Sequence, residues 1–421
     1  MSATAPRSPI LAGAAAATSK VDAWLAQEKA SSRNRLKWIA IATAIAALYP
    51  LLDSVTGFNQ LGAFVPMMVF VILAMGLNIV VGFAGLLDLG YVAFFVIGAY
   101  TAAFLTSPNS YFVQNGWVPG FMQHFWPAML VSWIVAAIFG VLLGAPTLRL
   151  RGDYLAIVTL GFGEIVPAFF TNAQTITNGA QGIGQIASPP AIPLPGGHEI
   201  AFDANHQANW YWLIMLVVLF SLWLITRLYD SRIGRAWQAI REDEIAASSM
   251  GISLTSTKLW AFALGASFSG FAGSVYSGYV KVVYPDQFQF SVSTMILAMV
   301  ILGGLGNTYG VIGGALIIGF FDRVLARELG TPLHWIGNRI ADTGIPGLSW
   351  LGEKIAGHDL TSDRYLIFGL ALVLVMLLSP GGLFPSKQRA AEMAGDDIDI
   401  DEMNQEMVDV QHGESSLSGR N

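Results

Sequence analysis

Two carboxyl groups stand inside long apolar stretches of the chain, where a charge would be costly if those stretches cross a bilayer. Asp88 lies between two glycine-rich apolar runs, and Glu164 lies within the run 155–170. An ionised group at the bilayer centre costs at least about 2.5–3.5 kcal/mol on insertion scales. We therefore expect both side chains to face the protein interior, a wet cavity or a bound partner. Each either lines a transport pathway or is a structural carboxyl, hydrogen-bonded or near the membrane interface, and we favour the structural reading.

One spacing of glycines occurs twice in the apolar part of the sequence. Gly82, Gly85 and Gly98 recur 221 residues later as Gly303, Gly306 and Gly319. Such paired interruptions are typical of a duplicated transporter scaffold whose pathway lies near the repeat interface. Chance is the alternative, because the chain holds 45 glycines. The candidate residues for a pathway or a helix break are Asn78, Gly82, Gly85, Asp88, Glu164, Gly303, Gly304, Gly306 and Asn307.

The largest stretch rich in both signs of charge is the loop 227–257. We predict two short helices in it, Ile233–Ile240 and Glu242–Met250. Acids in the first turn of the second helix complement its dipole, and Gly251 follows as a stop residue able to adopt the left-handed conformation. A projecting helical pair suits docking to a partner, with Glu244 free to face outward, and a solvated connector is the alternative. The candidate docking residues are Gly234, Arg235, Arg241, Glu242, Asp243, Glu244, Ala246, Ala247 and Gly251.

The sequence contains no pattern that predicts a catalytic centre. Cysteine is absent, which excludes disulfides and thiolate chemistry, and the six histidines are scattered through predicted loops and tails. No Gly-Lys dipeptide occurs, so a phosphate loop of the G-x-x-x-x-G-K-[ST] kind is impossible. We therefore predict a non-catalytic chain with no cofactor and no metal of its own.

The composition of the chain indicates that transmembrane helices position these candidate residues. The chain is 54% hydrophobic and 12% charged, against about 25% charged in soluble domains. A hydrocarbon core about 30 Å thick needs about 20 apolar helical residues. We predict an all-α polytopic membrane protein of about ten transmembrane helices, several broken by glycine. The predicted spans are 36–52, 61–81, 86–106, 125–147, 154–171, 210–226, 258–279, 291–306, 309–325 and 365–380.

The distribution of lysine and arginine predicts the orientation of these spans. Basic residues favour the cytoplasm, which places segment 1–35 and the loop 227–257 inside. The loops 107–124 and 172–209 lack lysine and arginine and are predicted to lie outside. Ten spans within a transmembrane domain 36–385 return the C-terminus to the cytoplasm. Residues 326–363 map outside although they carry three basic residues, so they are predicted to form an extracytoplasmic insertion, with a miscounted span as the alternative.

The C-terminal tail differs from the rest of the chain. Residues 390–421 hold nine acids and one arginine, whereas the whole chain has a net charge of -6. A segment with this like-charge excess and few large apolar side chains cannot form a packed core, so 386–421 is predicted to be disordered. Outside this tail the chain is slightly basic, and nothing in it predicts a nucleic-acid partner.

Several segments resemble one transporter family. The run Ile233–Gly251 is similar to the coupling loop of ABC importer permeases, with Glu244, Ala246, Ala247 and Gly251 resembling the EAA-and-glycine motif and Ile245 interposed. Three further segments resemble the LivM-type branched-chain amino-acid permeases more specifically: residues 76–90, 148–164 and 301–307. The N-terminal 35 residues, the 326–363 insertion and the acidic tail depart from the compact family pattern.

The resemblance implies a division of labour among several chains. It implies a second, LivH-type permease, two ABC ATPase subunits that carry ATP-Mg, and a periplasmic binding protein that delivers leucine, isoleucine or valine across a bacterial inner membrane. Two rivals stay open. One is a related ABC permease for urea, short amides or other amino acids, and the other is an ion-coupled secondary transporter that needs no ATPase.

Overall fold

The computed structural model describes residues 43–44, 46–55, 57, 60–147, 153–193, 199–203, 206–325, 338–340 and isolated positions between 366 and 384. The chain divides into two units, Met1–Asn59 and Gln60–Asn421. In the first unit the described part is chiefly the apolar helix Ala46–Val55, which overlaps the last residues of the first predicted span, 36–52, and extends beyond it. The predictions for 1–35, 326–363, 365–380 and 386–421 lie wholly or largely outside the described residues.

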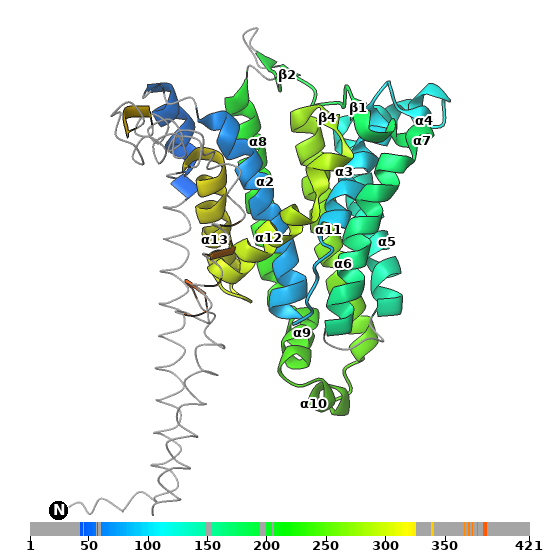
Figure 1. Ribbon diagram of the computed structural model, residues 1–421, viewed down its shortest axis with the longest axis vertical. Helices are drawn as coiled ribbons and strands as arrows, with labels where there is room; N and C mark the ends of the chain where they lie inside the picture. Colours follow the sequence, from blue (N-terminus) through cyan, green and yellow to red (C-terminus); the bar gives the residue numbers. More distant parts are fainter. Residues whose placement is uncertain are drawn as a thin grey trace, which may run out of the picture. The chain divides into compact units, whose positions relative to one another are not determined.

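Among the described residues of the second unit, eight helices are long and apolar enough to cross a membrane, which confirms the all-α polytopic class. Figure 1 shows how these helices are arranged. Each coincides with one of the predicted spans. The helices are α2 Leu61–Asn78 with the π-helix η1 Ile79–Phe83, α3 Val92–Thr106, α5 Phe125–Thr147, α6 Asp153–Asn172, α8 Gln207–Tyr229, α11 Leu254–Val280, α12 Phe290–Gly303, and α13 Thr308–Phe320 with the π-helix η5 Phe321–Leu325.

Two predicted boundaries are wrong because glycines end the helices. The span predicted from residue 86 begins at Val92, since residues 84–91 are not helical and Gly85 has φ +69°. The span predicted to run to residue 306 ends at Gly303, since Gly304 has φ +110°. Glycine adopts positive φ without the steric cost that a Cβ brings.

Short elements lie at the two ends of the helices in the second unit. Helices α9 Arg232–Glu242 and α10 Glu244–Ser249 project beyond the spans at one end (Figure 1). The other end carries the short helices α4 Tyr111–Gln114 and α7 Gln174–Thr177 and two antiparallel strand pairs. The strands are β1 Ile183–Gly184 with β4 Val282–Val283, and β2 Ile192–Pro193 with β3 Glu199–Ile200. The remaining short helices are η2 Gly120–Gln123, η3 Gly179–Gln181 and η4 Pro285–Phe288.

Helix α11 forms the centre of the packing and lies against α5, α3 and α2. Its small residues let the neighbouring backbones approach closely. A Cβ at Gly270 would meet the Ser132 carbonyl oxygen of α5 at 2.7 Å, and a Cβ at Gly273 would meet the Ala99 nitrogen of α3 at 2.8 Å. Hairpin α12–α13 is packed in the same way, because a Cβ at Gly314 would lie 2.6 Å from the Gly303 nitrogen.

Candidate functional site

Polar caps define the helical pair α9–α10 within the loop 227–257, which we call the coupling loop. The Ser231 hydroxyl accepts a hydrogen bond from the Gly234 amide at 3.2 Å and starts α9. Asp243 is extended, at φ -153°, and its carboxylate accepts from the amides of Ile245 at 2.7 Å and Ala246 at 3.0 Å. The two predicted helices are therefore present. Their junction is at Asp243 instead of between Ile240 and Glu242, because that carboxylate caps α10.

The base of α9 is fixed to the transmembrane helices. Trp237 is fully buried, and its indole N–H donates to the Thr257 carbonyl at 2.7 Å. Gly234 lies so close to the carbonyls of Leu228 and Tyr229 that a side chain would not fit. The base of the pair is therefore packed against the transmembrane helices.

Exposed apolar side chains lie at the far end of the pair, on α10 and just after it. Ile245 is 78% exposed and Met250 is 84% exposed, although Ala247 between them is buried. Gly251 follows with φ +83°, as the sequence predicted. We call residues 245–250 the tip of the coupling loop.

Glu244 does not face outward alone. Its carboxylate forms an ion pair with the Lys258 ammonium group at 2.5 Å. The Lys258 side chain is almost buried, whereas the Glu244 side chain is about half exposed. Sequence reasoning missed Lys258, although an isolated lysine near the start of an apolar helix is a signal for a nearby carboxylate. The pair ties the start of α10 to the start of α11.

Arg241 connects the coupling loop to the helix breaks. Its guanidinium Nη1 donates to the Gly82 carbonyl at 2.5 Å, across 159 residues of sequence. The Arg241 side chain also lies close to two glycines. A Cβ added to Gly85 would be 3.0 Å from the Arg241 Cγ, and a Cβ added to Gly306 would be 2.8 Å from the Arg241 Nη1. One side chain of α9 therefore contacts the first glycine break, residues 82–91, and lies against the second, residues 303–307.

The two glycine breaks also contact each other directly. The Asn78 side-chain oxygen accepts from the Gly306 amide at 3.0 Å, and a Cβ on Gly82 would lie 2.7 Å from that same nitrogen. Asn307 caps α13 by accepting from the Tyr309 amide at 3.2 Å. The structure thus brings most of the predicted set together in one place. The residues concerned are Asn78, Gly82, Gly85, Gly303, Gly304, Gly306 and Asn307.

Asp88 braces the non-helical segment between η1 and α3. The residue is 1% exposed, and its carboxylate accepts from the Gly90 amide at 2.9 Å. The same segment is held by the Leu89 amide, which donates to the Thr159 hydroxyl at 3.1 Å. Gly90 itself touches α6 so closely that a Cβ would lie 2.7 Å from the Thr159 carbonyl carbon. These contacts favour the structural reading of Asp88.

Glu164 lies apart from the other candidates. It is exposed on the outward face of α6, so the interior of this chain is excluded as its surroundings. Within the part of the chain that the structure describes, its carboxylate has no hydrogen bond or ion pair. Of the three surroundings expected for this carboxyl group, a wet cavity and a bound partner remain.

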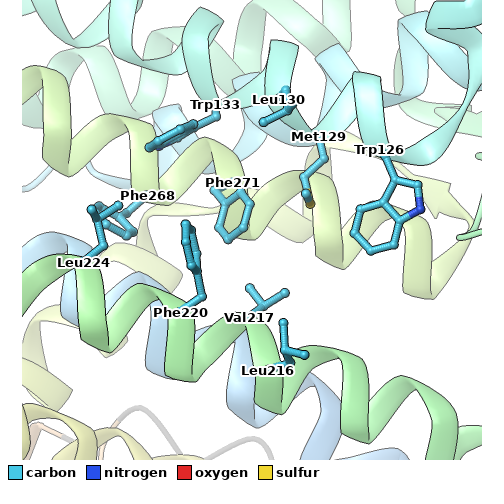
Figure 2. A pocket seen from close by; sticks show the side chains of 10 residues that line it. All are labelled: Trp126, Met129, Leu130, Trp133, Leu216, Val217, Phe220, Leu224, Phe268 and Phe271. Atoms are coloured by element: carbon cyan, nitrogen blue, oxygen red, sulfur yellow. The ribbon is translucent and has the colours of Figure 1, made fainter.

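A groove of about 220 Å³ opens between α5 and α8 over α11 (Figure 2), and no residue of the coupling loop lines it. Phe220 of α8 and Phe271 of α11 point into it, and Trp126 lies at one end (Figure 2). Apart from indole N–H donors, the lining is apolar. A groove without acceptors cannot satisfy the ammonium group of an amino acid, so it is not a candidate for that ligand. Among the described residues, no group of three or more His, Asp or Glu side chains is arranged to hold a metal ion.

Comparisons with known proteins agree with this architecture. Residues 59–337 match the family described as branched-chain amino acid transport system, permease component. The high-affinity branched-chain amino acid transport system permease protein LivM of Salmonella typhimurium is 38% identical over 333 residues, 76% of this chain and 68% of the relative. LivH of Escherichia coli is 23% identical over 271 residues, 62% of this chain and 83% of the relative.

A third relative has a different named substrate. The fructose import permease protein FrcC of Rhizobium meliloti is 30% identical over 208 residues, 48% of this chain and 55% of the relative. No solved structure matches the chain. The family match and the LivM identity, over helices that carry a capped projecting pair and two glycine breaks, show that this multi-pass membrane protein belongs to the permease components of branched-chain amino acid transport systems.

Proposed function

We propose that the chain is one of two different permease subunits in an ABC importer for leucine, isoleucine and valine. The second permease, two ATPases that hold ATP-Mg and a binding protein that delivers the amino acid complete the transporter. The names of the LivM and LivH relatives support both the substrate class and the pairing of two related permeases.

The observation that carries the proposal is the path from the tip of the coupling loop to the glycine breaks. Exposed Ile245 and Met250 offer a docking surface, and buried Trp237 fixes the base of α9. Arg241 then joins α9 to the Gly82 carbonyl. A push on the tip by an ATPase moves α9 as a rigid body and acts on the place where α2, α12 and α13 are interrupted.

The proposed orientation places the coupling loop in the cytoplasm of a bacterial cell, at the inner membrane. The end that carries α9 and α10 holds Arg232, Arg235 and Arg241, whereas the loop 107–124 at the other end has neither lysine nor arginine. Basic residues near span ends favour the cytoplasmic side. This orientation puts the tip within reach of soluble ATPases and the strand pairs toward the binding protein.

Alternating access is the transport mechanism that we propose. Close backbone contacts such as Gly303 with Gly314 allow helices to shift as units, because no side chain stands between the two backbones at that point. ATP-driven movement of the loop would open the break region first to one side and then to the other. This chain supplies the path and the connection to the ATPases, and the ATPases supply the chemistry.

Purification of the tagged chain from its native membrane tests the assembly. The expected result is co-purification of a second permease and two ATPases, with ATP-dependent uptake of leucine into vesicles when the binding protein is added. The isolated chain should neither hydrolyse ATP nor concentrate leucine. Ion-gradient-driven uptake by the isolated chain would establish the secondary-transporter rival instead.

The similarity to a fructose import permease favours one alternative, an importer of the same kind for another small solute. Competition of labelled leucine uptake by urea, short amides, other amino acids and fructose separates the two. The proposal expects competition by isoleucine and valine only.

A further inference from the structure

Helix α6 has two unlike faces. Its buried face is formed by Leu155, Thr159, Gly163, Val166 and Phe170. The opposite face carries a stripe of residues spaced three or four apart, which we call the α6 stripe. Its members are Ile157, Glu164 and Ala168, which are exposed, and Gly161, which is half-buried. Because an α-helix has 3.6 residues per turn, these four residues lie on the same side of α6.

Glu164 stands near the middle of the span. The span Tyr154–Asn172 has 19 residues, and Glu164 is the residue next to its central one. At about 1.5 Å per residue, both ends of the helix are more than about 10 Å away along its axis. The side chain is too short to reach either membrane surface from there, so whatever covers the α6 stripe must accommodate a carboxyl group at mid-span.

The exposed faces of α8 and α5 are different. Midway along α8 the exposed side chains are Trp212, Leu216, Phe220 and Trp223, and midway along α5 they are Leu130, Ile134, Ile138 and Phe139. These faces suit hydrocarbon, because they offer it no ionisable group and no polar group other than the indole N–H of tryptophan. The carboxyl on α6 instead marks a face for protein, since polar groups inside membranes are turned toward a neighbouring helix or a wet cavity.

We propose that the α6 stripe receives a transmembrane helix of the second permease subunit, one that carries a hydrogen-bond donor or a cation opposite Glu164. This inference rests on the proposed function, which supplies the second subunit. The small residues favour close contact: a Cβ on Gly161 would meet nothing within 4 Å, so the space beside the carboxyl is open in this chain alone. A helix lying over Gly161 and Ala168 would bring its own donor against Glu164 and exclude lipid from it.

The absence of native cysteine makes disulfide cross-linking a direct test. Gly161→Cys in this chain is combined with single cysteines placed along each transmembrane helix of the second permease, in the complete transporter. Leu216→Cys on α8 is the matched control, since Leu216 is exposed on an apolar face. The expected result is oxidative cross-linking from position 161 to one helix of the second permease, and none from position 216.

Substitution of the carboxyl gives a second readout. Glu164→Gln keeps hydrogen-bonding capacity and should retain near-normal co-purification of the second permease. Glu164→Leu should lower it at least tenfold, while this chain alone keeps its thermal stability, because the side chain is exposed and makes no hydrogen bond or ion pair among the described residues.

Three outcomes would overturn the inference. One is a second permease that co-purifies yet never cross-links to position 161. Another is labelling of Gly161→Cys by a membrane-impermeant hydrophilic thiol reagent, which would show a water-filled pathway at the stripe. A transporter that contains no second permease would overturn the proposed function as well, which distinguishes the two failures.

Discussion

Two glycines with the same backbone angle show how differently the two ends of the proposed coupling path are built. Gly251 beside the tip and Gly306 in the second glycine break both have φ +83°. A Cβ on Gly251 would meet nothing within 4 Å, whereas one on Gly306 would meet Arg241 at 2.8 Å and the Gly82 carbonyl oxygen at 3.2 Å. The tip needs glycine only for its backbone conformation, and the break needs it for space as well.

The tip is an exposed surface, whereas the break region is held by close backbone contacts. Around the tip, side chains are exposed and apolar, so substitutions there should change binding and leave the fold intact. Around the breaks, backbone touches backbone, so substitutions should change the fold or its motion. Arg241 is part of the coupling loop in the sequence, but its side chain bonds to Gly82 in the break region. Three changes test this division, in decreasing order of expected effect.

The largest effect is expected from Gly306→Ala compared with Gly251→Ala. Both variants place a non-glycine residue in the left-handed region at a cost of roughly 1–2 kcal/mol. Only Gly306→Ala also displaces Arg241 from its charge-assisted hydrogen bond, which is worth about 1.5–3 kcal/mol. The free energy of unfolding should fall by about 2.5–5 kcal/mol for Gly306→Ala and by at most about 2 kcal/mol for Gly251→Ala. Thermal unfolding in detergent measures both, and equal losses would contradict the comparison.

A binding defect without a folding defect is expected at the tip. Ile245→Asp removes an exposed apolar side chain whose burial against a partner is worth about 1.5–3 kcal/mol, so ATPase affinity should fall more than tenfold. Thermal stability should stay within about 0.5 kcal/mol, as for other surface substitutions. Ile245→Met is the control, because it keeps an apolar side chain and should bind normally. Titration of purified ATPase onto the permease checks this, and unchanged affinity of the Asp variant would remove the tip from the docking surface.

The smallest effect is expected from the ion pair between Glu244 and Lys258. Because Glu244 is half exposed, the pair should contribute about 0.5–1 kcal/mol. A double-mutant cycle with Glu244→Gln and Lys258→Met, read by thermal unfolding, isolates that coupling. A coupling of zero would mean that the pair does not hold α10 to α11, and Glu244 would return to its predicted role as an outward-facing charge.

Sequence reasoning predicted elements well where one physical rule dominates. Apolar length alone placed α5 at Phe125–Thr147, the same residues as in the structure. The acids and Gly251 predicted the helical pair, because caps and dipole effects are local. Repeated glycine spacing pointed to Gly82 and Gly306, which lie together although 224 residues separate them.

What the sequence did not predict depends on long-range contacts. Arg241 was one of several charges in a loop, and only the fold shows that its guanidinium reaches Gly82. The pairing of Lys258 with Glu244 likewise depends on how α10 folds back on α11. Glu164 was grouped with the helix breaks because both lie in apolar sequence, but the direction in which a side chain leaves its helix depends on which face is buried.

The most direct test of the proposed coupling path compares two arginines on α9. Arg241 bonds to Gly82 in the break, whereas exposed Arg235 bonds to the Asp230 carbonyl within the loop itself. Arg241→Ala and Arg235→Ala are each purified with bound ATPases, and ATP hydrolysis and leucine uptake are measured on the same vesicles. The account predicts that both variants keep bound, active ATPases, that Arg241→Ala loses at least tenfold in uptake per ATP, and that Arg235→Ala does not. Normal uptake per ATP by Arg241→Ala would contradict the account, because movement of the loop would then reach the breaks without this side chain.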